Sequence, residues 1–328
     1  MTSSRDRAPA ALLAAAADGD RVALARLLSL VERGGEPGRE AAALAYRSGV
    51  EARTVGITGA PGAGKSTLVD RLITVARADG SEVGVLAIDP TSPFSGGAIL
   101  GDRVRMQDHA LDEGVYIRSM ATRGHLGGLA VAVPEAIRVL ATVGLPLVLV
   151  ETVGVGQVEV EVAAATDTTV VVVNPRWGDA VQANKAGLLE IADVFVINKA
   201  DMPGAAETRR DLEAMLDLSA VGDWRPPVVE TEAVSGVGVE ALWGEVTRHQ
   251  RQLATGGALE RRRRERLERE LRQVLVARIE EEIRRLTGGR EFAAVAADVV
   301  EHRIDPYEAA DRLIREVARG DGGAPPAG

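Results

Sequence analysis

The chain has 328 residues, of which 46% are hydrophobic and 3% aromatic, and it carries a formal net charge of −9. This length allows a substantial buried core, and the low aromatic content predicts that alanine, valine and leucine build it. The acidic balance argues against nucleic acid as the main partner, and the absence of cysteine excludes disulfides and thiolate metal sites.

The sequence shows no sign of a membrane segment. It contains no uncharged apolar run of about 18 residues, and its N-terminus lacks a basic stretch followed by an apolar one. We therefore expect a cytoplasmic protein that has no membrane partner. The four histidines are scattered without ligand spacing, which favours solvated or capping roles over metal binding. They are His109, His125, His249 and His302.

The N-terminal segment has a helical pattern. Apolar side chains recur at helical spacing over residues 9–31, with a break at residues 15–19. Two glycines closely followed by a proline are expected to end the pattern at residues 34–37. We predict a helical N-terminal extension over residues 1–50.

Six short apolar runs in the middle of the chain predict β-strands. Their near-continuous apolar character, with helical stretches between them, indicates a largely parallel sheet that is buried on both faces. The runs are Thr54–Thr58, Val83–Ile88, Pro146–Val150, Thr169–Val173, Val194–Ile197 and Pro227–Val229. We therefore expect an α/β domain over residues 51–256, with ligands bound beyond the carboxyl ends of the strands.

A phosphate-binding motif follows the first run. Residues 59–66 match G-x-x-x-x-G-K-[ST], in which backbone N–H groups curl around phosphates. Lys65 is expected to reach the β and γ oxygens, and Ser66 to offer its hydroxyl to Mg²⁺. This motif predicts a P-loop NTPase. Its phosphate-binding residues are Gly59, Ala60, Pro61, Gly62, Ala63, Gly64, Lys65, Ser66 and Thr67.

A second motif, Asn198-Lys199-Ala200-Asp201, follows the fifth run and predicts the base. A carboxylate at Asp201 accepts from N1–H and the exocyclic amine of guanine, whereas adenine has no matching donor pair. A site of this kind rejects an analogue without the donors by about 10⁴-fold or more. The chain uses 3 lysines against 36 arginines, and two of the three are Lys65 and Lys199. We predict GTP or GDP as the ligand, and Lys185 becomes a further candidate.

Acidic residues between the two motifs are candidate magnesium ligands. Asp89 ends the second run, Asp102 follows in a turn-rich loop, and Glu151 ends the third run. A cap or turn role is the alternative for Asp89 and Asp102. Residues 151–154 stand where GTPases usually have Asp-x-x-Gly, so the Gly154 N–H is expected to meet the γ-phosphate and to be released when that phosphate is lost.

The sequence lacks the usual residue that orients the attacking water for hydrolysis. Ras-type GTPases orient the attacking water with a glutamine directly after this glycine, but Val155 occupies that position here. Gln157 is close enough to substitute, and an ordinary loop hydrogen bond fits it equally well. We therefore expect slow intrinsic turnover. The predicted catalytic residues are Lys65, Asp89, Glu151, Gly154 and Gln157.

The composition changes at residue 258 to a segment rich in arginine and glutamate. Residues 260–272 hold seven arginines and four glutamates, which favours a salt-bridged helical face over an RNA-binding patch. An apolar stripe runs from Leu267 to Leu286 and must pack either on the GTPase domain or on its copy in a dimer. We predict a helical dimerisation region over residues 257–319 and a disordered tail over residues 320–328.

Together these motifs resemble the MeaB/ArgK family of methylmalonyl-CoA mutase-associated GTPases, which is similar to the human methylmalonic aciduria type A protein. The resemblance extends from about residue 10 to residue 318. It rests on Gly59–Ser66, Asp89–Ser92, Gly96–Asp102, Glu151–Gln157, Gly178–Gly187 and Asn198–Asp201. It implies a homodimer and a chaperone that gates adenosylcobalamin delivery to a cobalamin-dependent acyl-CoA mutase and protects that mutase.

The resemblance also implies roles for single residues. It implies Mg²⁺ binding by Ser66, Asp89, Asp102 and Glu151, and guanine binding by Asn198, Lys199 and Asp201, with backbone N–H contacts from Ala233, Val234 and Ser235. It further implies a switch that signals to the mutase, formed by Asp179, Gln182 and Lys185. Two residues depart from the family pattern: Glu232 stands where a small serine is usual, and Arg176 replaces a common glycine.

Three other protein classes share part of this pattern. A P-loop kinase, the older amino-acid-transport label of the family, needs a second-substrate carboxylate or a catalytic base, and neither is evident. Metallochaperone GTPases usually carry tracts rich in histidine or cysteine, and signal recognition GTPases carry a methionine-rich tail; the chain shows neither. The particular mutase served stays open.

Overall fold

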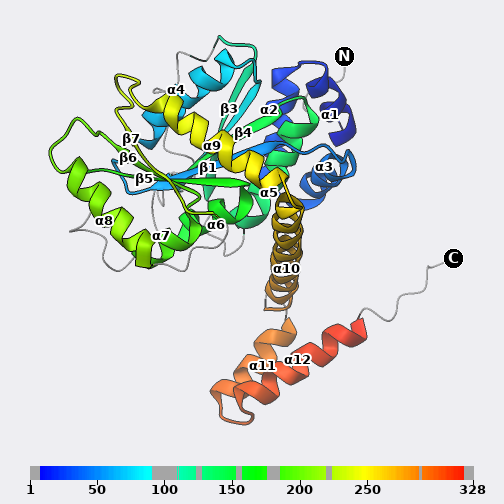
Figure 1. The fold of residues 1–328 in the computed structure, drawn as a ribbon. Helices are drawn as coiled ribbons and strands as arrows, with labels where there is room; N and C mark the ends of the chain where they lie inside the picture. Colours follow the sequence, from blue (N-terminus) through cyan, green and yellow to red (C-terminus); the bar gives the residue numbers. More distant parts are fainter. Residues whose placement is uncertain are drawn as a thin grey trace. The chain divides into compact units, whose positions relative to one another are not determined.

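The computed structural model describes residues 8–90, 109, 111–122, 128–152, 157–175, 185–218, 224–287 and 290–320 (Figure 1). The chain forms two compact units, Met1–Glu270 and Leu271–Gly328. Within the described ranges, no helix has both the length and the apolar character needed to cross a membrane.

A seven-stranded sheet in the order β3-β2-β4-β1-β5-β6-β7 forms the centre of the first unit. All of its strand pairs are parallel. The strands are β1 (Arg53–Gly59), β2 (Val83–Pro90), β3 (Val115–Thr122), β4 (Leu147–Thr152), β5 (Thr168–Val173), β6 (Val194–Asn198) and β7 (Val228–Thr231). The six expected strands are all present. The strand β3 was not predicted, because polar residues such as Arg118 and Ser119 interrupt its apolar pattern at the sheet edge.

Helices cover both faces of this sheet. On one face, α4 (Lys65–Ala78) and α9 (Val239–Ala254) pack on the strands. The other face carries α1 (Pro9–Ala17), α2 (Arg21–Arg33), α3 (Gly35–Arg47), α5 (Gly128–Thr142), α6 (Gln157–Ala165), α7 (Lys185–Ile191) and α8 (Ala205–Leu218). The predicted fold class, a P-loop α/β domain with a largely parallel sheet between helices, is confirmed.

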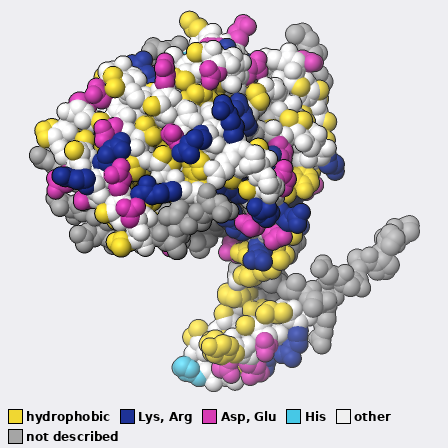
Figure 2. Space-filling view, viewed as in Figure 1, with side chains coloured by type: hydrophobic (Ala, Val, Ile, Leu, Met, Phe, Trp, Pro, Cys, Tyr) yellow, Lys and Arg dark blue, Asp and Glu magenta, His cyan; other side chains and the backbone are white. Residues whose placement is uncertain are grey.

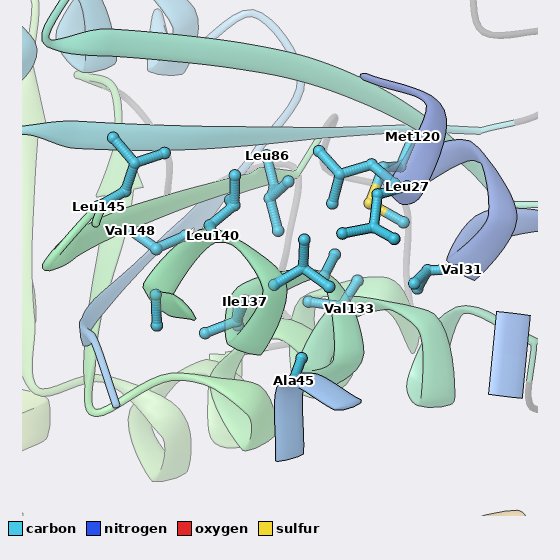
Figure 3. Packing of buried hydrophobic residues seen from close by; sticks show 14 of the residues in the cluster. Leu27, Val31, Ala45, Leu86, Met120, Val133, Ile137, Leu140, Leu145 and Val148 are labelled. Carbon is cyan, nitrogen blue, oxygen red and sulfur yellow. The ribbon is translucent and has the colours of Figure 1, made fainter. Parts of the chain in front are cut away.

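The N-terminal helices belong to the hydrophobic core. Leu27 and Leu28 of α2 are fully buried in the cluster that includes Met120 of β3 and Leu140 of α5 (Figure 3). The expected helix end at Gly34 is confirmed, because α2 ends at Arg33. Gly34 follows this end with a left-handed φ of 69°, and a further helix, α3, begins at the next residue, inside the segment where the sequence predicts a break. Pro37 is tolerated there because the N–H groups of the first helical turn have no partner within the helix.

The C-terminal region contains three helices, α10 (Ala258–Thr287), α11 (Arg290–Val300) and α12 (Pro306–Gly320). Asp305 caps α12 by accepting hydrogen bonds from the N–H groups of Tyr307 and Glu308, at 2.8 and 3.0 Å. Hydrophobic side chains gather along α10 (Figure 2), where Leu271 and Leu275 are 69% and 57% exposed. The side chain of Leu286 and the tail at residues 321–328 lie outside the described part of the chain.

Ion pairs fix the start of α10 to the amino-terminal edge of the sheet. Asp167, which precedes β5, accepts from Arg263 at 3.1 Å and Arg266 at 2.8 Å. Asp193, which precedes β6, accepts from Arg262 at 2.9 Å. These arginines therefore have carboxylate partners within the fold, as the salt-bridged interpretation of this segment predicts.

Candidate nucleotide-binding site

The P-loop connects β1 to α4 at the carboxyl edge of the sheet. Two of its positions require glycine, because the backbone has a positive φ there and a side chain would overlap neighbouring atoms. Gly59 has a φ of 132°, and a Cβ there would lie 2.0 Å from the carbonyl oxygen of Val172. Gly64 has a φ of 92°, and a Cβ there would lie 2.4 Å from Nδ2 of Asn198. Glycine is the residue that adopts such φ values without strain and leaves this room.

Lys65 is the first residue of α4, and its side chain lies within the loop. It is 5% exposed, and its Nζ donates to the carbonyl oxygens of Gly59 at 2.8 Å and Ala60 at 3.0 Å. The ammonium group is therefore held inside the concave P-loop, where the motif predicts phosphate oxygens. This placement puts a positive charge next to the N-terminus of α4, which itself favours anions.

Ser66 and Glu151 come together beside the P-loop. The Ser66 hydroxyl donates to Oε1 of Glu151 at 2.6 Å, and both side chains are buried. Glu151 lies in β4, which pairs with β1 on one side and β2 on the other, and Asp89 lies near the end of β2. A hydroxyl and a carboxylate are the hard oxygen ligands that Mg²⁺ prefers, so the residues present fit this ion.

The structure brings together two of the four predicted magnesium ligands. Within the described ranges, no cluster of three or more His, Asp or Glu side chains could hold a metal. The side chain of Asp89 and the whole of Asp102 lie outside those ranges. Ser66 and Glu151 are therefore the pair on which a magnesium site would be built.

Asn198 connects the base-recognition motif to the P-loop. Its Nδ2 donates to the carbonyl oxygen of Ala63 at 2.8 Å. Its Oδ1 accepts from the Thr231 hydroxyl at 3.1 Å and from the Ala233 N–H at 3.0 Å. Because Asn198 is only 2% exposed, this buried amide fixes the P-loop, the end of β6 and the loop after β7 in one arrangement.

The neighbouring residue, Lys199, has a left-handed backbone with a φ of 60°. Its Nζ donates to the carbonyl oxygen of Gly62 at 2.9 Å, so its side chain also crosses to the P-loop. Non-glycine residues in this conformation are uncommon, and they concentrate at functional sites where the surrounding structure holds them. The motif is thus attached to the phosphate loop by two consecutive side chains.

A cavity of about 390 Å³ opens beside this junction. Its volume is within the usual range of small-molecule sites. Predicted nucleotide-binding residues line it: Gly64, Thr67, Asn198, Lys199, Asp201, Ala233, Val234 and Ser235. Met202 and Glu232 also line it and were not predicted as binding residues. The position of Glu232 next to Ala233 was the signal in the sequence that could have identified it.

Several predicted residues cannot be placed in this site. Gln157 and Lys185 begin α6 and α7, but their side chains lie outside the described part of the structure. Gly154, Asp179 and Gln182 lie outside it altogether. Their roles stay predictions. A second cavity, of about 280 Å³, is lined by Thr54, Ile137 and Arg138 among others and contains none of the predicted nucleotide-binding residues.

The P-loop, the parallel sheet and the base-recognition motif define a P-loop GTPase. The chain matches the profile of the family of methylmalonyl Co-A mutase-associated GTPase MeaB over residues 24–287. It therefore belongs to this family, as its motifs predicted, and it is a GTPase.

Relatives and a solved structure agree with this assignment. The chain is 50% identical to a GTPase of Pyrococcus abyssi, with 92% of this chain and 94% of that protein covered. It is 35% identical to the mitochondrial methylmalonic aciduria type A homolog of Mus musculus, with 75% of this chain and 64% of that protein covered. The solved structure of a LAO/AO transport system kinase is similar with a TM-score of 0.69 and 25% identity, covering 94% of this chain and 97% of that one.

Proposed function

We propose that the protein binds GTP beside the P-loop, hydrolyses it slowly, and uses this cycle to gate adenosylcobalamin delivery to an acyl-CoA mutase and to protect that mutase. Methylmalonyl-CoA mutase is the first candidate partner, because the family is described as associated with it. The observation that carries the GTP-binding part is the hydrogen bond from Asn198 to Ala63, which holds the base pocket against the phosphate loop.

In the proposed complex, Lys65 exchanges its bonds to the Gly59 and Ala60 carbonyls for bonds to phosphate oxygens. Asp201 accepts from N1–H and the amine of guanine, and backbone N–H groups of Val234 and Ser235 face the base. Ser66 and Glu151 would hold Mg²⁺, together with Asp89 and Asp102. The bound ion would neutralise charge on the β and γ phosphate oxygens.

Slow turnover follows from the side chain at position 155. Valine can neither donate to a water molecule nor accept from it, so no residue directly after Gly154 orients the nucleophile. Gln157 is the candidate substitute. A partner that orders this segment is therefore expected to accelerate hydrolysis.

Exchanging Asp201 for asparagine tests the base assignment. Asp201→Asn replaces an acceptor-only carboxylate with an amide that presents a donor to the guanine donors. The preference for GTP over ATP should fall from at least about a thousandfold to within about tenfold in a displacement titration. Glu207→Gln, at an exposed position on α8, is the matched control. A variant that retains a thousandfold preference would contradict the assignment.

The partner class is tested by GTP turnover with and without a cobalamin-dependent acyl-CoA mutase. We expect the mutase to accelerate hydrolysis by about one to three orders of magnitude, a modest share of the roughly 10³ to 10⁵ that an added arginine finger can provide. Lys185→Ala should lose most of this acceleration and keep its intrinsic rate, because Lys185 is assigned to coupling. If the mutase accelerates neither wild type nor Lys185→Ala, the proposed class of partner is wrong. If it accelerates both equally, Lys185 has no role in coupling.

We also propose a homodimer formed through α10. A stripe of exposed apolar side chains supports it: Leu267, Leu271, Leu275, Ile279 and Ile283 are between 38% and 69% exposed. A second copy of the same helix would cover this stripe. The double variant Leu271→Glu and Leu275→Glu should sediment as a monomer and still bind GTP. Wild-type protein that sediments as a monomer at micromolar concentration would overturn the proposal.

One measurement separates hydrolysis from the kinase alternative. If γ-labelled GTP releases its phosphate to water, the protein acts as a hydrolase; if the label appears on a protein, it acts as a kinase. We further propose that the protein acts in the cytoplasm, which fractionation of the producing cells would test.

A further inference from the structure

The cavity assigned to guanine is lined by a second acidic residue in addition to Asp201. Glu232, on the loop between β7 and α9, lines the same cavity. This residue immediately precedes Ala233, whose N–H is bonded to Asn198. Glu232 therefore lines the cavity from the loop that Asn198 fixes.

The backbone of Glu232 is held on both sides. Its N–H donates to the carbonyl oxygen of Val237 at 2.9 Å, and its carbonyl oxygen accepts from the N–H of Gly236 at 2.8 Å. The tight loop closes at Gly238, which has a φ of 79° and where a Cβ would lie 2.1 Å from the carbonyl oxygen of Glu230. The side chain of Glu232 thus starts from a fixed position.

Ser235 holds the carboxylate itself. The Ser235 hydroxyl donates to Oε2 of Glu232 at 3.0 Å, and it lies 3.1 Å from the Glu232 carbonyl oxygen. A carboxylate has two oxygens and about four lone-pair positions. One bond to a hydroxyl therefore orients the group and leaves it able to accept further donors.

Guanine offers more donors than one carboxylate uses. Asp201 accommodates N1–H and one N–H of the exocyclic amine, and the amine carries a second N–H. This second N–H points away from the two N–H groups that Asp201 accepts. It therefore needs another acceptor once the base leaves water and enters the pocket. Hydrogen bonds to charged acceptors are the stronger ones.

We propose that Glu232 is a second specificity residue for guanine, which accepts the N–H of the exocyclic amine that Asp201 leaves unused, with Ser235 as its positioning residue. This proposal rests on the assignment of the cavity to guanine. The proposed contact also gives a reason for a glutamate at position 232, where the family pattern has a small serine. The negative charge of Glu232 is offset by the N–H donors of the bound base. Inosine nucleotides keep N1–H but lack the exocyclic amine. Comparing GTP with ITP therefore measures the contact of Glu232 with the amine apart from the contact of Asp201 with N1–H.

Competition binding with GTP, ITP and ATP tests the proposal. In Glu232→Ala, the affinity for GTP should fall about tenfold while that for ITP and ATP stays within twofold of wild type, so the GTP-to-ITP ratio falls about tenfold. Glu232→Gln keeps an acceptor oxygen without the charge and should lose less. Ser235→Ala, which releases the carboxylate, should lower the ratio by about threefold. Glu240→Ala, at an exposed position on α9, is the matched control.

The outcomes separate this proposal from the function on which it rests. If wild type prefers GTP over ATP but the ratio of GTP to ITP in Glu232→Ala stays within twofold of wild type, the role of Glu232 is overturned. The same holds if the variant loses GTP and ITP equally, because that result shows a structural effect on the pocket. If wild type shows no preference for GTP over ATP, the guanine assignment itself fails. Should Glu232→Ala not fold, Glu232→Gln decides with the smaller expected change.

Discussion

Glu135 on α5 makes the stability of the first unit sensitive to pH. Burial raises the pKa of this carboxyl from its ordinary value of 4.5 to about 7, against the opposing effect of Arg138, and Glu270 raises it further. Between these two pH values the folded protein holds a proton that the unfolded chain has released. Folding stability therefore falls as the pH rises from 4.5 through 7, and it stays lower above that.

The magnitude follows from the two pKa values. Each pKa unit is worth about 1.4 kcal/mol, so the penalty at pH 8 is about 3 kcal/mol at most. Glu135→Gln keeps the shape of the side chain and removes the titration. The variant should match wild type near pH 4.5 and be more stable by about 1–3 kcal/mol at pH 8.

Urea unfolding at pH 5, 6, 7 and 8, followed by tryptophan fluorescence, measures this difference. The three tryptophans are Trp177, Trp224 and Trp243, and all precede Leu271, where the second unit begins. Glu240→Gln, at an exposed carboxylate, is the matched control and should follow the wild-type profile. If Glu135→Gln also runs parallel to wild type across this range, Glu135 is ionised in the folded protein at neutral pH and the reasoning from burial is refuted.

Two further substitutions test the ion pairs at the start of α10 and the backbone of the P-loop. Asp167→Ala should lower the free energy of unfolding by about 2–4 kcal/mol, because it leaves Arg263 and Arg266 without this buried acceptor. Urea titration measures the loss. A change below about 0.5 kcal/mol would show that these ion pairs contribute little to stability. Gly59→Ala should abolish GTP binding and destabilise the fold by at least about 2 kcal/mol, since its Cβ would overlap the Val172 carbonyl at a φ of 132°. Titration with a fluorescent GTP analogue checks this, and wild-type affinity would show that the backbone can move.

The sequence by itself determined the chemical parts of the site and most of the sheet. Residue types set these features locally: glycine permits the φ values of the P-loop, Lys65 supplies a compact charge, and continuous apolar runs mark strands that are buried on both faces. For that reason the P-loop, the motif at Asn198 and six of the strands could be predicted. The edge strand β3 was not predicted, because a half-exposed strand has a weaker apolar pattern. The start of α3 at Gly35 was not predicted, because two glycines closely followed by a proline usually mark a turn and not a new helix.

Only the tertiary structure decided which of these parts meet. The pairs Asn198 with Ala63 and Ser66 with Glu151 are 135 and 85 residues apart in the chain. Their contacts depend on the strand order β2-β4-β1-β5-β6, which crossover connections set and local patterns do not encode. The position of Glu232 at the cavity beside the P-loop has the same origin. Hydrogen-bonding groups can be read from residue types, but the distances between them come from the packing of the sheet.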